Sequence, residues 1–424
     1  MRASVFLLIP LLLFMLMVDF YTYRGIKPLI AKISYLYLRR FLEFIFWGIS
    51  IIVFLGFVVF MFGIKHVHKS DAYIYVGYLV AGFSLFYIPK FVFILFVLIK
   101  DIQGAIVTTV RWLRERKKKS VPQLNAKRKM ERSEFLYQMG LMLAAIPFAS
   151  ILYGVTKGKF NFRVMKEKIH FDHLPQSFQG LKIVQISDMH LGSFNKNYEK
   201  IAKAVELINQ QEPDLILFTG DLVNNFAEET DGWVSVLSGM KAKIGKYSIL
   251  GNHDYGDYSY WDSPQLKEAN LQAIKDFHSK MGFELMLNEN KTIAIDGEEI
   301  ALIGVENWGK PPFPQHGDLK KASEGIQSVP FKILMSHDPS HWDAQVLDTN
   351  IALTFSGHTH GMQFGIERAG IKWSPIQYKY PRWGGLYRES AQYLYVNRGF
   401  GYIGFPGRIG MPPEITVVEL ISHG

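Results

Sequence analysis

The C-terminal half of the chain carries five short groups of residues that could bind metal ions. They are Asp188-Met189-His190, Gly220-Asp221, Gly251-Asn252-His253-Asp254, His337-Asp338 and Gly357-His358-Thr359-His360. Each group follows an apolar, strand-like run. Carboxylates, an amide oxygen and imidazoles are ligands that first-row divalent cations accept. The set is large enough to hold two cations side by side, and such a pair is suited to cleaving phosphate esters.

The spacing within the groups favours shared sites. In an extended turn, side chains two residues apart can point to one side, which suits Asp188 with His190 and His358 with His360. Asp221 follows a glycine that permits close backbone approach, and its carboxylate is the natural bridge between two cations. The predicted metal ligands are Asp188, His190, Asp221, Asn252, His337, His358 and His360. Two cations held there would activate a water molecule for in-line attack on phosphorus.

His253 is left over from the ligand set and is the predicted catalytic residue. Its position beside Asn252 suits donation of a proton or hydrogen bond to the leaving oxygen. We expect Asp254 to hold the His253 ring.

Apolar runs that read as strands alternate with helical patterns after residue 180. Predicted strands are 181–187, 214–219, 246–250, 300–305, 331–336, 351–356, 393–397 and 415–420, and predicted helices are 197–210 and 264–281. Continuous apolar strands indicate sheets covered on both faces. The candidate ligands follow strand ends, where open α/β sheets place their sites. Residues 155–168 read as a basic connector.

The N-terminal part has a different composition, so the 424 residues predict two domains. We expect an all-α transmembrane region over 1–155 and a soluble α/β domain over 156–424. Predicted spans are 3–22, 42–64, 72–99 and 135–154. The first reads as a span rather than a signal peptide, because it lacks a cleavage site. The third is read as one span despite Pro89.

Charge predicts the orientation of these spans. The net charge is +9, and its basic excess is concentrated between residues 24 and 40 and between 111 and 132. Four crossings put both basic loops on one side, which should be the cytoplasm. The soluble domain would then lie on the extracytoplasmic side of a bacterial inner membrane, with no nucleic acid partner. The chain has no cysteine, which excludes disulfides and thiolate metal sites.

The motifs DMH, GDLVN, GNHDY, SHDPS and GHTHGMQ together resemble those of the calcineurin-like metallophosphoesterases. The resemblance covers about 181–420 and is strongest to a bacterial membrane-anchored branch related to UDP-2,3-diacylglucosamine pyrophosphatases. It implies a four-layer α/β/β/α sandwich and two divalent ions, such as Mn, Fe or Zn. It also implies that His253 is the catalytic histidine.

The resemblance further implies how the ligands divide between the ions. One ion would take Asp188, His190, Asp221 and His360. The other would take Asp221, Asn252, His337 and His358. The transmembrane region lies outside the shared part of the chain and inherits no function from the resemblance.

Together these features predict a membrane-anchored two-metal phosphohydrolase that cleaves a phosphate ester or pyrophosphate bond in a lipid or cell-envelope precursor. The main alternative is a non-catalytic metal-binding membrane sensor or scaffold, although the intact His253 argues against it. A transporter is disfavoured because the spans hold few charges, namely Asp19, Glu43 and Lys90. A nucleic-acid enzyme is disfavoured because the basic clusters flank the membrane.

Several further residues have two readings. Arg398 and Arg408 could grip a phosphate or form internal salt bridges. Gln363 could contact substrate or belong to a polar loop. Asp338 could orient a ligand or cap a turn. Aromatic loop residues could line a lipid groove or simply pack, and these are Trp308, Phe313, Trp373 and Trp383.

Overall fold

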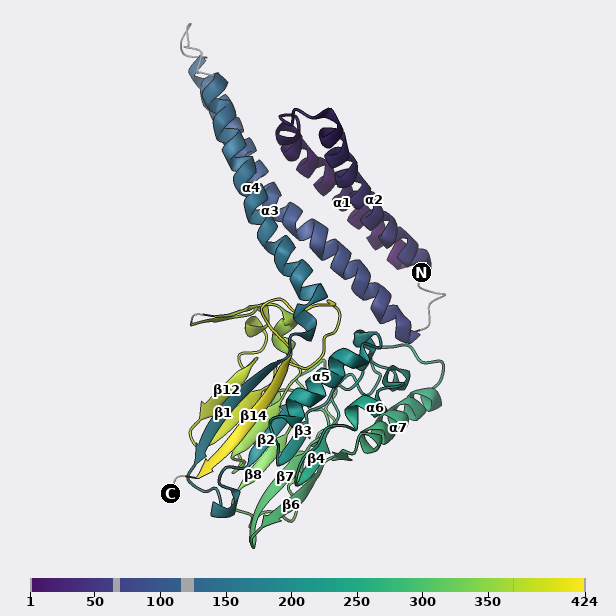
Figure 1. The fold of residues 1–424 in the computed structure, drawn as a ribbon, viewed down its shortest axis with the longest axis vertical. Helices are drawn as coiled ribbons and strands as arrows, with labels where there is room; N and C mark the ends of the chain where they lie inside the picture. Colours follow the sequence, from purple (N-terminus) through teal and green to yellow (C-terminus); the bar gives the residue numbers. More distant parts are fainter. Residues whose placement is uncertain (1, 64–68, 116–125, 369, 423–424) are drawn as a thin grey trace. The chain divides into compact units, whose positions relative to one another are not determined.

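The computed structural model describes residues 2–63, 69–115, 126–368 and 370–422. The chain separates into two compact units, one of residues 1–67 and 75–153 and the other of residues 68–74 and 154–424 (Figure 1). Part of the second predicted basic loop, residues 116–125, lies outside the described residues.

The first unit consists of long helices. They are α1 (Arg2–Ile30), α2 (Leu36–Gly63), α3 (Lys69–Glu115) and α4 (Ala126–Thr156). Each contains a stretch long and apolar enough to cross a membrane, in agreement with the predicted spans. Helix α3 runs unbroken through Pro89, so the third predicted span is a single helix that continues well beyond residue 99.

Two charges inside this unit are paired rather than isolated. Lys90 Nζ lies 2.5 Å from Asp19 Oδ1, and the buried hydroxyl of Tyr87 donates to Asp19 Oδ2 at 2.9 Å. Ser50 also donates to Asp19, at 3.1 Å, so the network joins α1, α2 and α3. Ionisable groups within membrane helices characteristically pair in this way.

The second unit is built on two six-stranded sheets. The first has the order β1-β14-β2-β3-β4-β5 and comprises β1 (Arg163–Phe171), β14 (Glu414–Ser422), β2 (Lys182–Ile186), β3 (Leu215–Phe218), β4 (Gly245–Ser248) and β5 (Glu284–Leu285). The second has the order β12-β13-β9-β8-β7-β6 and comprises β12 (Gly385–Glu389), β13 (Gln392–Val396), β9 (Leu353–Ser356), β8 (Lys332–Met335), β7 (Glu298–Gly304) and β6 (Glu289–Ile295). Strands β2 to β5 are parallel to one another, as are β13, β9, β8 and β7.

The basic connector expected at 155–168 is wrong in its second half. Residues from Arg163 form β1, which pairs in parallel with β14 along its whole length. Its side chains alternate between exposed and partly buried before the buried Ile169 and Phe171. Such a half-exposed edge strand tolerates charged residues, and these charges made the segment resemble a connector in the sequence.

Helices cover the outer face of each sheet. On the first sheet lie α5 (Tyr198–Asn209), α6 (Val234–Leu237) and α7 (Pro264–Lys280) (Figure 1). The short helix α8 (Leu319–Ala322) packs against the second sheet. Helix α5 buries Ile201, Ala204, Val205 and Ile208 against the sheet, as its periodicity predicts. Helix α7 begins after Ser263, whose hydroxyl accepts from Leu266 N, with Pro264 in its first turn.

Three apolar cores define the layers. One lies between the first sheet and its helices, and another between the second sheet and α8. The third core lies between the sheets, where Leu215 and Leu217 meet Leu302, Ile333 and Phe355. The unit is therefore a four-layer α/β/β/α sandwich, as the family resemblance implied.

Candidate metal centre

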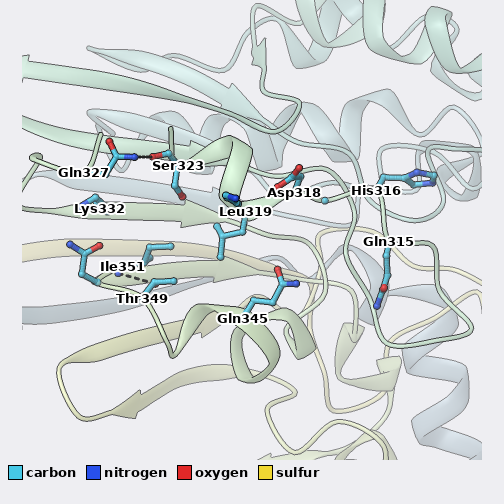
Figure 2. A pocket seen from close by; sticks show the side chains of 13 residues that line it. Gln315, His316, Asp318, Leu319, Ser323, Gln327, Lys332, Gln345, Thr349 and Ile351 are labelled. Atoms are coloured by element: carbon cyan, nitrogen blue, oxygen red, sulfur yellow. Dashed lines mark hydrogen bonds between the residues drawn. The ribbon is translucent and has the colours of Figure 1, made fainter. Parts of the chain in front are cut away.

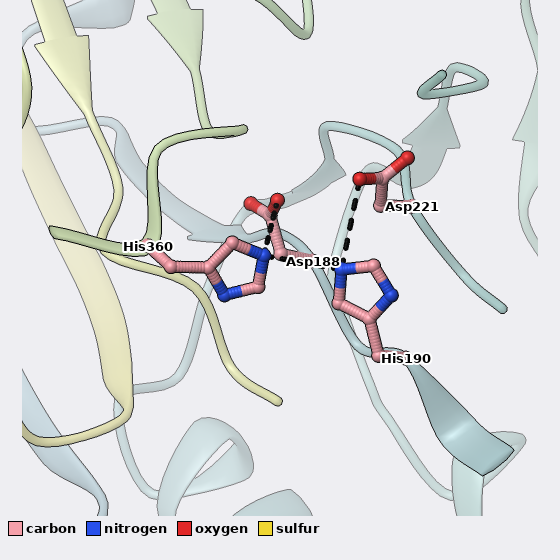
Figure 3. Close-up of side chains that lie close together, drawn as sticks. All are labelled: Asp188, His190, Asp221 and His360. Carbon is pink, nitrogen blue, oxygen red and sulfur yellow. Dashed lines mark hydrogen bonds and ion pairs between the residues drawn. The ribbon is translucent and has the colours of Figure 1, made fainter. Parts of the chain in front are cut away.

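The parallel strands of both sheets deliver the predicted ligands to one place. Asp188 and His190 follow β2, and Asp221 follows β3. His360 follows β9 in the second sheet. One possible ligand atom from each of these four residues lies within 4.8 Å of the others, and all four are buried (Figure 3). His360 Nε2 is 3.2 Å from Asp188 Oδ1, and His190 Nε2 is 3.6 Å from Asp221 Oδ2.

A second cluster shares Asp221 with the first. It joins Asp221, His337 after β8 and His358 after β9, again with ligand atoms within 4.8 Å of one another. Asn252, which follows β4, adds its amide oxygen 2.8 Å from His358 Nδ1. The Asn252 amide nitrogen donates to the Tyr258 hydroxyl at 2.9 Å, which fixes the side-chain orientation. Every predicted ligand therefore lies in one of two adjoining groups.

The backbone is strained where the ligands are held. Asp188, His190, Asp221, His358 and His360 all have φ between +47° and +69°, in the left-handed region. Residues other than glycine adopt this conformation uncommonly, Asp and His more often than most, and such residues cluster at functional sites. The strain turns consecutive side chains towards one centre, which regular strands cannot do.

Two glycines are required by the crowding. A Cβ atom at Gly251 would collide with the Asp221 carboxylate, and one at Gly357 would collide with Ser187 and the Asp188 carboxylate. The glycines thus let the ends of β4 and β9 pass directly behind the carboxylates.

Hydrogen bonds to backbone carbonyls fix the tautomers of two histidines. His190 Nδ1 donates to Val223 O at 3.2 Å, and His337 Nδ1 donates to Thr219 O at 2.7 Å. A carbonyl only accepts, so Nδ1 carries the proton and Nε2 presents a lone pair to the site. This arrangement is typical of metal-binding histidines.

The residues present fit divalent cations. Within the described part of the chain, His337 Nε2 is buried without a hydrogen-bond partner, although Asp221 Oδ2 is 3.2 Å away. His190 Nε2 and His360 Nε2 face each other at 3.1 Å. Opposed lone pairs repel unless a proton or cation lies between them. A pair of divalent cations would satisfy all these atoms, and the donor set suits several first-row metals.

The local electrostatics favour positive charge at the centre. Burial alone would lower the pKa of His337, but the Asp221 charge outweighs it and raises that pKa to about 10. Burial would raise the pKa of Asp221, yet His337 and His253 hold it well below its ordinary value. The charge of Asp221 thus favours a positive charge beside His337.

His253 lies beside the first cluster and is half-buried. Its backbone N–H donates to Asp221 Oδ1 at 2.8 Å, and its ring packs edge-on against His190. The expectation that Asp254 holds this ring is wrong, because His253 Nδ1 bonds to Asn224 O at 2.8 Å. A backbone carbonyl therefore sets the ring orientation and leaves Nε2 free.

Asp254 instead organises the loop that carries Asp221. Its carboxylate accepts backbone N–H bonds of Asp221, Leu222 and Gly251 at 2.8–3.0 Å and of Val223 at 3.3 Å. Burial and the charge of Asp221 raise the pKa of Asp254 to about 7. Asp254 thus positions the shared ligand through the backbone.

Glu229 braces the next part of the same loop. Its carboxylate accepts from the backbone nitrogens of Gly192, Asn224, Asn225 and Phe226. Asn224 is the residue whose carbonyl holds His253. Burial raises the pKa of Glu229 to about 7, although these backbone hydrogen bonds oppose the shift.

Asp338, Tyr380 and Phe313 surround His358. Asp338 has both expected roles, since its Oδ2 lies 3.6 Å from His358 Nε2 and its Oδ1 accepts from Ser340 N. The Tyr380 hydroxyl is 2.9 Å from His358 Nε2, and Phe313 packs edge-on against the ring. Sequence reasoning missed Tyr380 and Tyr258. Tyr258 lies just after the Asn252 motif, a signal that could have been followed, whereas Tyr380 has none.

Other polar candidates have internal partners. Arg398 is buried and pairs with Glu414 at 2.6 Å and with Glu367 at 2.7 Å. Arg408 donates to the carbonyl oxygens of Arg398 and Gly401, and Gln363 donates to Phe405 O. Arg398 thus follows the salt-bridge reading and Gln363 the loop reading, whereas Arg408 bonds to backbone carbonyls and places Nη2 3.3 Å from His360 Nδ1.

A separate pocket lies between α8 and the end of β8 (Figure 2). It is lined by Gln315, Leu319, Lys332, Gln345 and Ile351, among others. None of the candidate ligands lines it. Lys332 is buried there and donates to Val329 O at 2.7 Å.

Sequence comparisons agree with this geometry. The family described as "Calcineurin-like phosphoesterase" matches residues 181–362, and "Probable Calcineurin-like phosphoesterase, transmembrane domain" matches 1–159. The uncharacterized metallophosphoesterase YkuE of Bacillus subtilis is 31% identical over 306 residues, which is 70% of this chain and 99% of that protein. A zebrafish (Danio rerio) "Transmembrane protein with metallophosphoesterase domain" is 31% identical over 63% of this chain, which spans 60% of that relative's length.

Similarity to solved structures is weak by comparison. The NAD nucleotidase of Haemophilus influenzae aligns with a TM-score of 0.35 and 15% identity, over 53% of this chain and 45% of that one.

Proposed function

This chain belongs to the calcineurin-like phosphoesterase family, and we propose that it is a membrane-anchored hydrolase of a phosphate ester or pyrophosphate bond in a lipid or envelope precursor. The observation that carries this proposal is the sharing of Asp221 by two buried Asp/His clusters. A shared carboxylate is the arrangement expected where two cations act on one phosphoryl group.

We assign the ligands to two cations. Asp188, His190, Asp221 and His360 would hold one, and Asp221, Asn252, His337 and His358 the other. When bound, such ions supply a nucleophile at neutral pH and offset negative charge on the phosphoryl oxygens. The proposal extends to Mn, Fe or Zn as the metal, since the mixed nitrogen and oxygen donors suit all three.

His253 is the proposed proton donor. Its Nδ1 is already bonded to Asn224 O, so only Nε2 can face the substrate. A protonated ring would give that proton to the leaving oxygen as the phosphorus–oxygen bond breaks. Asn224 and, through the backbone, Glu229 would keep the ring in place.

The proposal of a lipid substrate is based on the membrane helices. Four helices can span a bilayer, and the transmembrane family match covers the same residues. We propose the functional division of the chain near residue 155, with the catalytic part on the extracytoplasmic side of a bacterial inner membrane. The distribution of Lys and Arg in the loops supports this side.

The test uses the full chain purified in detergent. We expect Mn²⁺-dependent phosphate release from a phosphorylated lipid and from a water-soluble aryl phosphate, and loss of both activities in Asp221→Asn. Leu266→Ser, an exposed change on α7, is the matched control. Metal binding without any turnover would instead support the sensor alternative. A reporter fused to the C-terminus tests the proposed side.

A further inference from the structure

A small hairpin follows the ligand His360 in the chain. It pairs β10 (Ile366–Arg368) with β11 (Ile371–Trp373) in antiparallel register. Ile366 lies opposite Trp373, and Arg368 lies opposite Ile371. Directly opposed residues share one face of a sheet, as do residues two apart. Phe364 extends this face, because its ring packs edge-on against Trp373 at 6.1 Å. We use the term apolar hairpin face for the surface formed by Phe364, Ile366, Arg368, Ile371 and Trp373.

The other face of the hairpin is fixed to the catalytic unit. Glu367 pairs with the buried Arg398 at 2.7 Å. Lys372 donates to Gly384 O and lies over the Trp383 ring, 5.2 Å from its centre. These contacts hold one side of the hairpin to the catalytic unit, and the apolar residues lie on the opposite side.

Large apolar side chains of this segment are exposed, which is the reverse of what is usual in a water-soluble domain. Phe364, Ile366 and Ile371 are 44%, 51% and 58% exposed, and Met362 is 55% exposed. Between them Gly361, Gln363 and Gly365 are buried. Glu367 and Lys372 are exposed as well, so the hairpin stands out from the surface with its apolar face uncovered.

Elsewhere in the described catalytic unit, exposed large hydrophobic residues are spread over separate elements. They are Val234, Ile244, Tyr258, Tyr260, Leu266 and Tyr378. Single exposed apolar residues are ordinary, whereas a contiguous group indicates a binding surface. The hairpin is therefore the strongest candidate for such a surface.

We propose that the apolar hairpin face docks into the interfacial layer of an anionic phospholipid bilayer. The chain itself supplies the reason for this occupant. The stretch suited to crossing the membrane ends at Phe160, and β1 begins at Arg163, so the tether spans only about 10 Å. Trp373 and Arg368 are residue types that settle at the membrane interface.

Charge supports the choice of anionic lipid. Arg368 shares the apolar face, and Lys379 is exposed nearby in the chain. Lys379 Nζ lies 5.1 Å from the ring centre of Phe313, the ring that packs against His358. Basic residues beside an inserting apolar surface strengthen binding to acidic headgroups.

Docking would bring lipid phosphate groups beside the metal centre. The hairpin continues directly from the loop that holds His360. Lys379 contacts the ring of Phe313, which packs against His358. The substrate would then be a phosphorylated lipid presented from the bilayer surface. This consequence rests on the proposed function, whereas docking itself does not.

The absence of cysteine makes a direct test possible. Single variants Ile371→Cys and Ile366→Cys carry an environment-sensitive fluorophore, and Leu266→Cys on α7 is the control of similar exposure. The labelled full chain is reconstituted in nanodiscs containing phosphatidylglycerol. Quenching is measured with nitroxide-bearing lipids and, separately, with aqueous iodide.

We expect lipid-borne quenching at 371 and 366 to exceed that at 266 roughly threefold, with the reverse order for iodide. Equal behaviour at all positions would overturn the proposal. Shielding of 371 from both quenchers would also overturn it, because a protein would then cover the face. The readout needs no turnover, so an inactive enzyme with lipid-quenched labels would refute only the proposed function.

Discussion

At the scale of single residues, the proposed metal ligands and the proposed proton donor have separable roles. His253 contacts the shared ligand only through its backbone N–H, which donates to Asp221 Oδ1. Its ring is oriented by Asn224 O. Removing the ring should therefore leave both clusters intact but eliminate the proposed proton donor.

We predict that His253→Gln lowers kcat by about two to four orders of magnitude. The loss should be smaller for an aryl phosphate with an acidic leaving group, which needs no proton, than for an alkyl phosphate. Metal content, measured by mass spectrometry of the purified protein, should not change. Loss of metal together with activity would show that His253 is a ligand.

Glu229 gives a prediction about pH. Burial raises its pKa to about 7, so the folded protein holds the proton more tightly than the unfolded chain. The stabilisation is complete below the ordinary pKa and disappears as the pH rises to about 7. A shift of this size corresponds to about 3 kcal/mol.

Glu229→Gln mimics the protonated side chain and should not show this loss. From pH 4.5 to 7.5, the melting temperature of the wild type should therefore fall relative to that of the variant, as measured by differential scanning fluorimetry in detergent. A wild type that instead gains stability as pH rises would mean that the four backbone N–H groups stabilise the ionised form more than burial destabilises it.

At the scale of elements, the strands that could be predicted are those buried on both faces. Strand β3, for example, is buried at every position, so its continuous apolar run could be recognised as a buried strand from the sequence. Strand β1 was missed because half its side chains remain exposed and charged. The hairpin of β10 and β11 was missed for the opposite reason, since its apolar residues face outward.

The same logic applies to the site. Ligands could be predicted because each follows a recognisable strand, and the edge of a parallel sheet brings such positions together. Tyr380 lies beyond any such rule, because it reaches His358 only through the packing of a long loop. Asp254 was assigned the wrong partner, because the sequence cannot distinguish a ring nitrogen from the backbone nitrogens next to it.

Substitution of Arg398 tests the ion pairs that join strands near the site. It follows β13 and pairs with Glu414 at the start of β14 and with Glu367 of β10. Arg398→Ala should cost about 3–5 kcal/mol, because it leaves the buried Glu414 charge without its partner. Thermal unfolding in detergent measures the effect.

The matched control for Arg398→Ala is Lys243→Ala, which breaks the exposed ion pair with Asp214. Exposed ion pairs contribute little to stability, so this variant should melt close to the wild type. Similar melting temperatures for the two variants would contradict the structural role of Arg398 and reopen the possibility that it binds substrate.

At the scale of the whole molecule, the candidate centre lies between two sheets that are otherwise joined by apolar packing. Asp188, Asp221 and Asn252 follow strands of the first sheet, whereas His337, His358 and His360 follow strands of the second. Cations bound to both sets would connect the two halves of the sandwich. Metal binding should therefore stabilise the folded state and not only the site.

We predict that chelation with EDTA destabilises the full chain, and that Mn²⁺ at about 100 times its dissociation constant restores about 2.7 kcal/mol. For a unit of this size, that corresponds to a rise in melting temperature of roughly 5–10 °C. Differential scanning fluorimetry over a Mn²⁺ titration gives the dependence. Asp221→Asn, which weakens both clusters, should abolish the rise, whereas Leu266→Ser should keep it. A wild type whose melting temperature is indifferent to Mn²⁺ would mean that the two sheets hold these side chains together without binding an ion.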